Sequence, residues 1–125
     1  MLQIQSQIQI MPEHMKAFSF NEAEMKITLS TNGESACWVE ATVAVPRPLS
    51  LAPDRSLETG KMLFGILSNG AEREKRVKIF ANGDVYPNIY SVKITLFIYD
   101  ESGAISERME ISKDIECSDQ NAKVL

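Results

Sequence analysis

The sequence predicts an all-β domain built as a two-sheet antiparallel β-sandwich of seven to eight strands. Apolar and polar residues alternate with a period of two in most segments, which is typical of strands that bury one face. Apolar residues at helical spacing are nearly absent, and short turns containing Gly or Asn separate the segments. A proline-rich segment over residues 46–60 supplies the long connection that crosses between two sheets.

Three alternating segments occupy the N-terminal part. The apolar residues of the first are Leu2, Ile4, Ile8 and Ile10, and those of the second are Met25, Ile27 and Leu29. Pro12 is expected to end or bend the first strand, and Asn32-Gly33 to reverse the chain tightly after the second. The third strand runs from Ala36 to Val45. Its expected inward residues are Cys37, Val39, Ala41, Val43 and Val45.

The remaining strands follow the proline-rich segment, which we expect to be a loop with one short edge strand over residues 49–51. Strands are expected over residues 61–67, 74–80 and 90–99, and a last one begins at residue 105. Turns are expected at residues 68–70, 82–84 and 100–103. The inward sets of the last two strands are Tyr90, Val92, Ile94, Leu96 and Ile98, and Ile105, Met109, Ile111 and Ile115. We expect one domain over residues 1–117 and a polar, frayed tail over residues 118–125.

This series of strands and turns favours an immunoglobulin-like sandwich, with a small closed barrel as the alternative. The stretch from Leu63 to Ile105 reads FGILSNGAEREKRVKI and then VYPNIYSVKITLFIYDESGAI. It resembles the Ig-like accessory modules of archaeal and bacterial proteins, including the cell-adhesion-related type. The resemblance implies a fold rather than a function, because sandwiches host many unrelated roles.

Tyr90 occupies the position of a tyrosine corner, a tyrosine whose hydroxyl folds back onto upstream backbone. It follows the bend over residues 87–89 and precedes the inward Val92 by two residues. Val92 lies where antibody domains have their second cysteine, so the disulfide-bearing pattern is absent. We therefore expect a structural hydrogen bond from Tyr90 and no disulfide across the core at this position.

Composition narrows the class of partner. The chain has 13 basic and 17 acidic side chains and a formal charge of −4, which disfavours binding to nucleic acid. With 44% hydrophobic residues it has enough apolar surface for a packed core. No apolar run approaches the ~20 residues of a membrane helix, and the first residues lack the pattern of a signal peptide. We expect a cytoplasmic protein without membrane insertion.

Reactive chemistry is sparse, and we expect no enzyme, cofactor, metal or small-molecule ligand. His14 is the single histidine, so no set of nucleophile, base and orienting residue is evident. Met11 and Met15 could ligate copper with His14, but covering the bottom of the core is the favoured role. Free thiols are favoured over a disulfide for Cys37 and Cys117, and their distance in space stays open.

The strongest functional signal is apolar surface on faces assigned to solvent. Trp38, Phe97 and Tyr99 all fall on outward positions, where they would form an aromatic patch for a partner. Alternatively, the face assignment is inverted or both faces of that sheet are covered.

A basic cluster, Arg73, Lys75, Arg76 and Lys78, could contact an acidic partner or protect a strand edge from unwanted pairing. The sequence thus predicts a non-enzymatic interaction or assembly module that presents a sheet face or edge strand to a protein or to itself. A carbohydrate-binding or enzyme-accessory sandwich is the alternative.

Overall fold

The computed structural model describes residues 4–32, 35–68 and 70–119, and this part of the chain contains eight strands and no helix. The strands are β1 (Ile4–Met11), β2 (His14–Lys16), β3 (Asn21–Thr31), β4 (Cys37–Ala44), β5 (Thr59–Leu67), β6 (Glu72–Ala81), β7 (Asn88–Tyr99) and β8 (Ile105–Ser118). The all-β prediction is confirmed. Leu2, Gly33 and Asn69, which the sequence assigns to a strand and two turns, lie outside the described residues.

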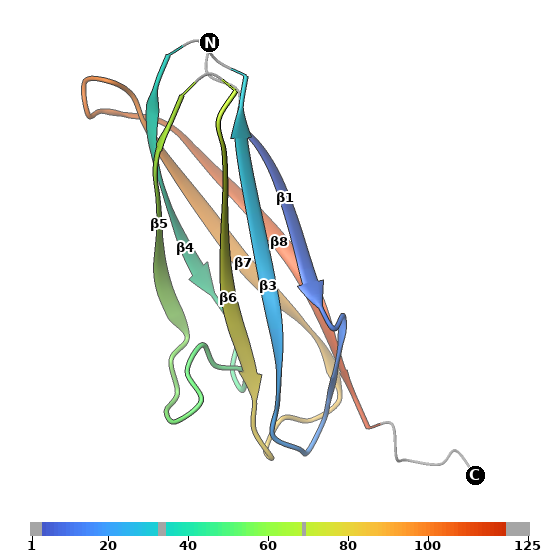
Figure 1. Cartoon of the computed structure of the whole chain (residues 1–125). Coiled ribbons are helices and arrows are strands. Elements are labelled where there is room, and N and C mark those ends of the chain that lie inside the picture. The colour runs from blue at the N-terminus through green and yellow to red at the C-terminus, as the bar shows by residue number, and fades with distance from the viewer. Residues whose placement is uncertain (1–3, 33–34, 69, 120–125) are drawn as a thin grey trace.

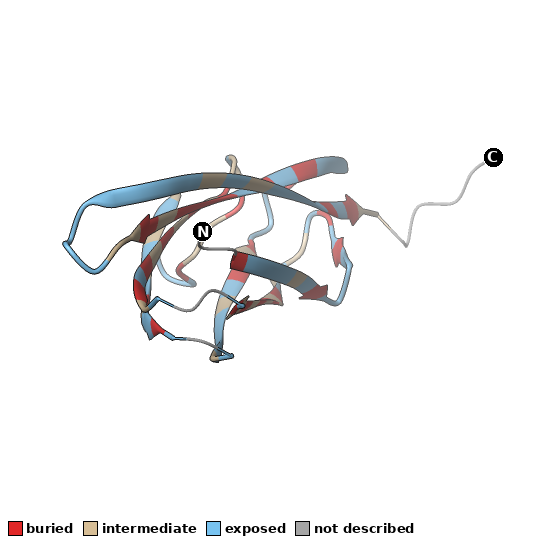
Figure 2. Ribbon diagram, turned by 90° about the horizontal axis from the view of Figure 1, so that it is seen from above, coloured by how far each residue is buried: buried red, intermediate tan, exposed pale blue. Residues whose placement is uncertain are grey.

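The strands form two sheets that pack as a β-sandwich (Figure 1). Sheet A has the order β1-β3-β6 and sheet B the order β2-β8-β7-β4-β5. Neighbours pair antiparallel, except that β2 runs parallel to β8. Buried residues line the facing sides of both sheets, and sheet B curves around the smaller sheet A (Figure 2).

The core lies between the inner faces of β4 and β7 on one side and β3 on the other. All ten residues predicted to point inward from β4 and its end, and from β7, are at most 5% exposed. Met25, Ile27 and Leu29 of β3 are fully buried and belong to the same cluster. Each such aliphatic side chain contributes about 1.5–3 kcal/mol when fully removed from water, so period-two alternation determines which faces meet.

The chain changes sheets after Pro12, which the sequence only predicted to end or bend the first strand. His14–Lys16 pairs with Glu116–Ser118 of β8 as the short strand β2, which is too short to show a period. Met15 is buried there, as expected, but the prediction for Met11 is wrong because its side chain is 72% exposed. Met11 lies opposite Glu24 on the outer face of sheet A, one residue past the inward Ile10.

The proline-rich connection is an ordered loop. Instead of a short edge strand over residues 49–51, Ser50 alone bridges Phe80 of β6, through two backbone hydrogen bonds of 2.7 and 3.0 Å. The Ser50 hydroxyl also accepts from the backbone N–H groups of Ala52 and Leu57. These bonds satisfy backbone N–H groups of the loop that have no partner on a neighbouring strand.

Two register shifts interrupt the alternation in sheet B. One lies between Val39 and Glu40 of β4, where Phe64 is the extra residue on β5. The other lies between Ile98 and Tyr99 of β7, which oppose Glu107 and Ile105 of β8. Because a bulge reverses the side-chain alternation, Ile105 shares the outer face with Tyr99. The prediction that Ile105 points inward with Met109 is therefore wrong.

A hydrogen bond fixes the start of β7, where the chain has crossed from sheet A to sheet B. The Tyr90 hydroxyl donates to the backbone oxygen of Tyr86 over 2.7 Å, and the two rings meet edge to face at 6.0 Å. The Tyr90 ring is buried, and burial raises the pKa of its hydroxyl. This is the geometry that a tyrosine corner requires.

Tyr90→Phe should lower the free energy of unfolding by about 1–3 kcal/mol, because it leaves the Tyr86 carbonyl without its donor. Urea denaturation followed by circular dichroism measures the change. Tyr86→Phe keeps that carbonyl and its ring, and should stay within about 0.5 kcal/mol of the wild type. Equal stability of the Tyr90→Phe protein and the wild type would show that the hydrogen bond is not a structural one.

Candidate functional site

One apolar row crosses the outer face of sheet B at the end where β4 begins. Ile66 of β5 opposes Trp38 of β4, Trp38 opposes Tyr99 of β7, and Tyr99 opposes Ile105 of β8. Directly opposed residues share a face of the sheet, with Cβ atoms about 4.5–5.5 Å apart in antiparallel pairs. Since Cys37 and Val39 are buried on either side of Trp38, this row faces away from the core.

The next row mixes apolar and charged residues. Leu63 opposes Glu40, Glu40 opposes Phe97, and Phe97 opposes Arg108. The Trp38 indole N–H donates to Glu40 over 3.1 Å, and the Arg108 guanidinium lies 5.7 Å from the centre of the Phe97 ring. The charged groups therefore pack against the aromatic rings rather than separate them.

We define the outer patch as the apolar residues of these two rows. They are Trp38, Leu63, Ile66, Phe97, Tyr99 and Ile105. Ile66 is 60% exposed and Trp38 38%, whereas Phe97 and Tyr99 are half-buried by their neighbours. The structure brings together the three aromatic residues singled out from the sequence, and the inverted face assignment is excluded.

Ion pairs border the outer patch along the sheet. Lys61 lies 3.4 Å from Glu40, and Glu110 lies 3.1 Å from Arg108 and 3.6 Å from Lys93. All these side chains belong to the same outer face, because their strand partners lie in register. An apolar area with a charged border is the composition found at the centre and rim of protein interfaces.

Sequence reasoning missed the three aliphatic members of the outer patch. Leu63 and Ile66 occur in the run KMLFGIL, whose apolar residues show no alternation, and Ile105 was assigned to the core. The signal that could have found them is Gly65, which has a positive φ of 81° beside the bulge. Glycine inside a strand often marks such a bulge, where the inward and outward assignments must be exchanged.

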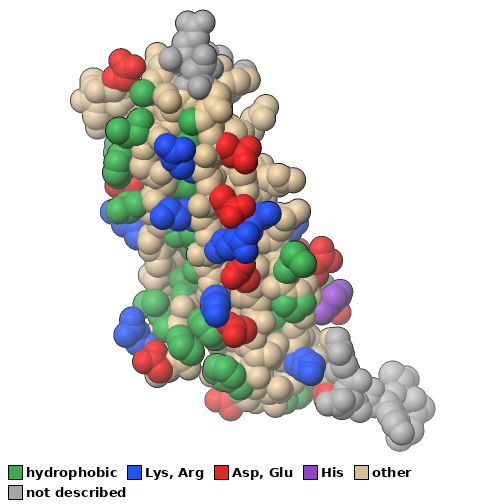
Figure 3. Space-filling view, in the orientation of Figure 1, with side chains coloured by type: hydrophobic (Ala, Val, Ile, Leu, Met, Phe, Trp, Pro, Cys, Tyr) green, Lys and Arg blue, Asp and Glu red, His purple; other side chains and the backbone are tan. Residues whose placement is uncertain are grey.

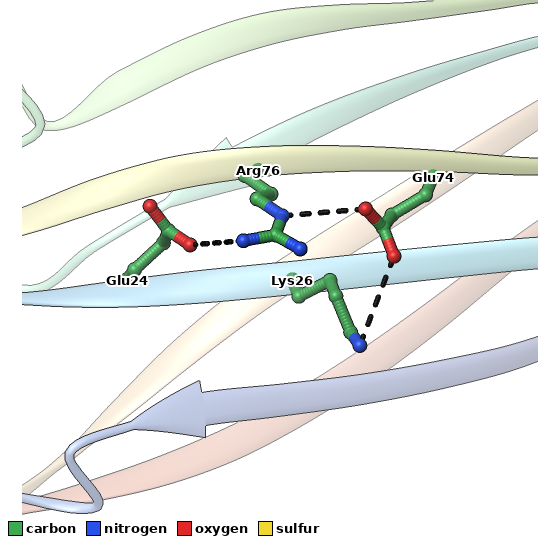
Figure 4. A network of polar contacts seen from close by, with 4 residues as sticks. All are labelled: Glu24, Lys26, Glu74 and Arg76. Carbon is green, nitrogen blue, oxygen red and sulfur yellow. Dashed lines mark hydrogen bonds and ion pairs between the residues drawn. The ribbon is translucent and has the colours of Figure 1, made fainter.

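The structure divides the basic cluster between two faces of β6. Arg76 and Lys78 lie on the outer face of sheet A. Arg73 and Lys75 lie on its inner face, the one to which Val77 and Ile79 belong. Arg76 is paired with Glu24 at 3.0 Å and Glu74 at 3.3 Å, and Glu74 also lies 3.7 Å from Lys26 (Figure 4). The four side chains therefore do not form one basic surface.

The outer face of sheet A is polar along most of its length, and its apolar residues Met11 and Phe80 lie at one end. Glutamines of β1 and charged residues of β3 and β6 occupy the outward positions, and basic and acidic side chains are interleaved along it (Figure 3). Lys78 completes the series with an ion pair of 3.3 Å to Glu22. Such exposed pairs contribute about 0–1 kcal/mol each and keep their solvation, so this face is suited to water rather than to a partner.

No metal-binding grouping occurs among the described residues. His14 is exposed, and its Nδ1 lies 3.4 Å from a carboxylate oxygen of Glu116 on the adjacent strand. Within the described ranges no three His, Cys, Asp or Glu side chains could hold a metal ion together. No helix that could span a membrane occurs in that part of the chain either.

A hollow of about 300 Å³ lies beside the proline-rich loop, lined in part by Phe20, Ser50, Arg55 and Phe80. The Ser50 hydroxyl, which could orient a ligand, is already bonded within the loop. Among the described residues, no buried side-chain nitrogen or oxygen lacks a hydrogen-bond partner. The hollow therefore presents no buried polar group that is reserved for a ligand.

The two cysteines lie at opposite ends of the sandwich. Cys37 precedes Trp38, which opposes Tyr99 at the end of β7, whereas Cys117 opposes Asn88 at its start. At about 3.4 Å per residue, the eleven steps of β7 separate these ends by roughly 35 Å, and a disulfide requires Cα atoms within about 7 Å. Both thiols are free and buried, and burial raises the pKa of each.

Solved structures resemble this fold at low sequence identity. A Bordetella pertussis protein described as ApaA has a TM-score of 0.54 at 13% identity, over 97% of this chain and 95% of that one. The chain also aligns with 30% of the alkylpurine DNA glycosylase AlkC of Pseudomonas fluorescens at a TM-score of 0.44. A β-glucosidase of Listeria innocua aligns over 16% of its length at a TM-score of 0.32. Only the first similarity supports the fold, and none indicates a function.

No family model matches the chain, and no curated protein matches it in sequence.

Both cysteines should react slowly with a thiol reagent in the native protein and rapidly after unfolding in guanidinium. The reason is that burial limits access and the raised pKa keeps the thiolate fraction small at neutral pH. The rate should rise with pH up to and beyond the usual thiol range. Following released thionitrobenzoate with time checks this prediction. Fast labelling of two thiols in the native state would contradict it.

Proposed function

We propose that this domain is a non-enzymatic interaction module of the immunoglobulin-like type, which uses the outer patch to bind an apolar surface of another protein. The observation that carries the proposal is the row from Ile66 through Trp38 and Tyr99 to Ile105, which sheet register aligns on a solvent-facing side. Soluble domains seldom expose contiguous apolar groups without an interaction that covers them.

The strand order supports the immunoglobulin-like assignment. In that fold the strands A, B and E share one sheet, and C, F and G share the other. Here β1, β3 and β6 take the first set of positions, and β4, β7 and β8 take the second. β5 lies beside β4 as strand C′ does in variable-type domains, and Tyr90 lies near the start of the F-equivalent strand β7.

The chemistry of the outer patch favours a protein partner over a sugar. Carbohydrate recognition by stacking needs an open aromatic plane with hydrogen-bonding groups around it. Around Trp38, the neighbours Ile66 and Leu63 are aliphatic, and the indole N–H already donates to Glu40. Tryptophan and tyrosine are enriched among the residues that dominate protein-binding energy, and aliphatic neighbours exclude water from them.

In this proposal the protein acts in the cytoplasm. Two buried, unpaired thiols are typical of a reducing compartment, whereas small domains of oxidising compartments more often join their cysteines. The outer patch then serves partners that share this compartment.

Ile66→Asp should weaken partner binding without unfolding the domain, since it introduces a charge at an exposed position of the outer patch. Ile89→Asp is the matched control, because Ile89 is 61% exposed on the same sheet face at the far end of β7. A partner is captured from extract of the native organism with the wild type, purified, and titrated against all three proteins. The variant at residue 66 should bind at least about tenfold more weakly than the control.

Trp38 is the single tryptophan of the chain, so its fluorescence reports on the outer patch directly. Binding of the purified partner should shift its emission to shorter wavelength, because the indole loses contact with water. Equal binding by both aspartate variants, or binding without a change in emission, would overturn the proposal. An emission shift produced by soluble glycans instead would favour the carbohydrate-binding alternative.

A further inference from the structure

The edge of sheet B along β8 is open. β2 covers only Glu116–Ser118, so in the described part of the chain Ile105–Ile115 pairs with β7 alone. The backbone N–H of Glu116 donates to the carbonyl oxygen of Glu13, and the Ser118 carbonyl accepts from the N–H of Ala17. The backbone N–H and C=O groups of even-numbered residues therefore point away from β7 here. By the alternation of a strand, residues 108, 110, 112 and 114 direct theirs to the open edge.

The inward side chains along this edge form a self-complementary series. Glu107, Met109, Ile111 and Lys113 oppose inward residues of β7. Met109 and Ile111 are only partly buried against the core, and the two charged residues are exposed. Acid, apolar, apolar and base thus follow one another at equal spacing. Such a sequence is complementary to its own reverse.

We propose that a second copy of this chain adds its β8 antiparallel to this edge, with a twofold axis through Glu110. The Glu107 side chain then meets the partner's Lys113, and Met109 meets the partner's Ile111, each contact occurring twice. These are the pairs without hydrogen bonds, in which opposed side chains lie closest. Glu110 and its counterpart, and Arg108 with the partner's Ser112, exchange the backbone hydrogen bonds.

Two independent features select this register. Glu110 is the midpoint of the open stretch between the start of β8 and the residues that β2 covers, so pairing there uses the whole edge. A shift of the partner strand by two residues would place Met109 opposite Lys113, or Glu107 opposite Ile111. Either shift replaces both ion pairs and both Met109–Ile111 contacts by two mismatched contacts and a single apolar contact on the axis.

The charges in this arrangement are compatible with pairing. Inward charges on an edge prevent association when like charges meet, as along a lysine-rich edge. Here the two signs are equidistant from the axis, so each inward charge meets its opposite. The Glu110 carboxylates approach each other on the outer face, but each one already has Arg108 at 3.1 Å and Lys93 at 3.6 Å.

The pairing extends sheet B continuously through both copies. A twofold axis perpendicular to the joined sheet leaves both outer faces on the same side, so both outer patches would face one direction. A dimer could then bind two sites of a repetitive or dimeric partner with gain in avidity. The pairing does not use residues of the outer patch, so the dimer can be tested separately from the proposed function.

Charge exchange tests the pairing by sedimentation velocity over a concentration series. The wild type should dimerise, whereas Glu107→Lys and Lys113→Glu should each raise the dissociation constant at least about tenfold. The double variant should restore it to within about threefold, since both ion pairs re-form with the charges exchanged. Lys75→Glu, at an exposed position of β6, is the control and should behave as the wild type.

A cysteine at the axis tests the register. Glu110→Cys should form a disulfide between copies under mild oxidation, because hydrogen-bonded partners have Cα atoms about 5.5 Å apart. Ser112→Cys should not, because two copies of residue 112 would be four positions out of register. A monomeric wild type at about 100 µM, single variants that dimerise normally, a double variant that stays weak, or equal cross-linking of both cysteines would each overturn the proposal. Ile66→Asp should leave the dimer intact, which separates this result from failure of the outer patch.

Discussion

Every feature of this molecule depends on the closure of two inner sheet faces over one core. Val39, Val43, Ile94 and Leu96 of sheet B and Ile27 of sheet A are all fully removed from water. A single sheet cannot bury an apolar face by itself, so the inner faces of the two sheets pack against each other. The outer face of each sheet stays in contact with solvent. The location of each functional candidate follows from which side of this division its residue occupies.

The outer patch reaches its full extent because the alternation fails at two places. Both register shifts flank the Trp38–Tyr99 pair, one on each side of it across the sheet. The first turns Leu63 to the outer face and the second turns Ile105 there. Bulges redirect side chains in this way at little cost to the rest of the ladder. Two local irregularities therefore add Leu63 and Ile105 to the apolar surface that Trp38 and its regular neighbours already form.

The two sheets divide their roles. The outer face of sheet A is occupied mostly by interleaved charges and glutamines, which stay hydrated and leave little apolar surface to bury. Sheet B combines an apolar outer end with an edge along β8, and over most of this edge no described segment pairs with the outward backbone groups. Both binding surfaces proposed for this domain thus belong to one sheet, and the other acts as the layer that completes the core.

The sequence by itself determined the all-β class and the inward sets of the long strands. In β4 and β7 the period of two continues unbroken, and burial then follows from local pattern alone. Trp38, Phe97 and Tyr99 could be assigned to an outer face for the same reason. The exposure of Met11 and the division of the basic cluster follow from the same period of two. Only the tertiary structure decided the short strand β2 and the outward position of Ile105. Both depend on pairing between segments distant in the chain, and a register shift of one residue reverses every side chain beyond it.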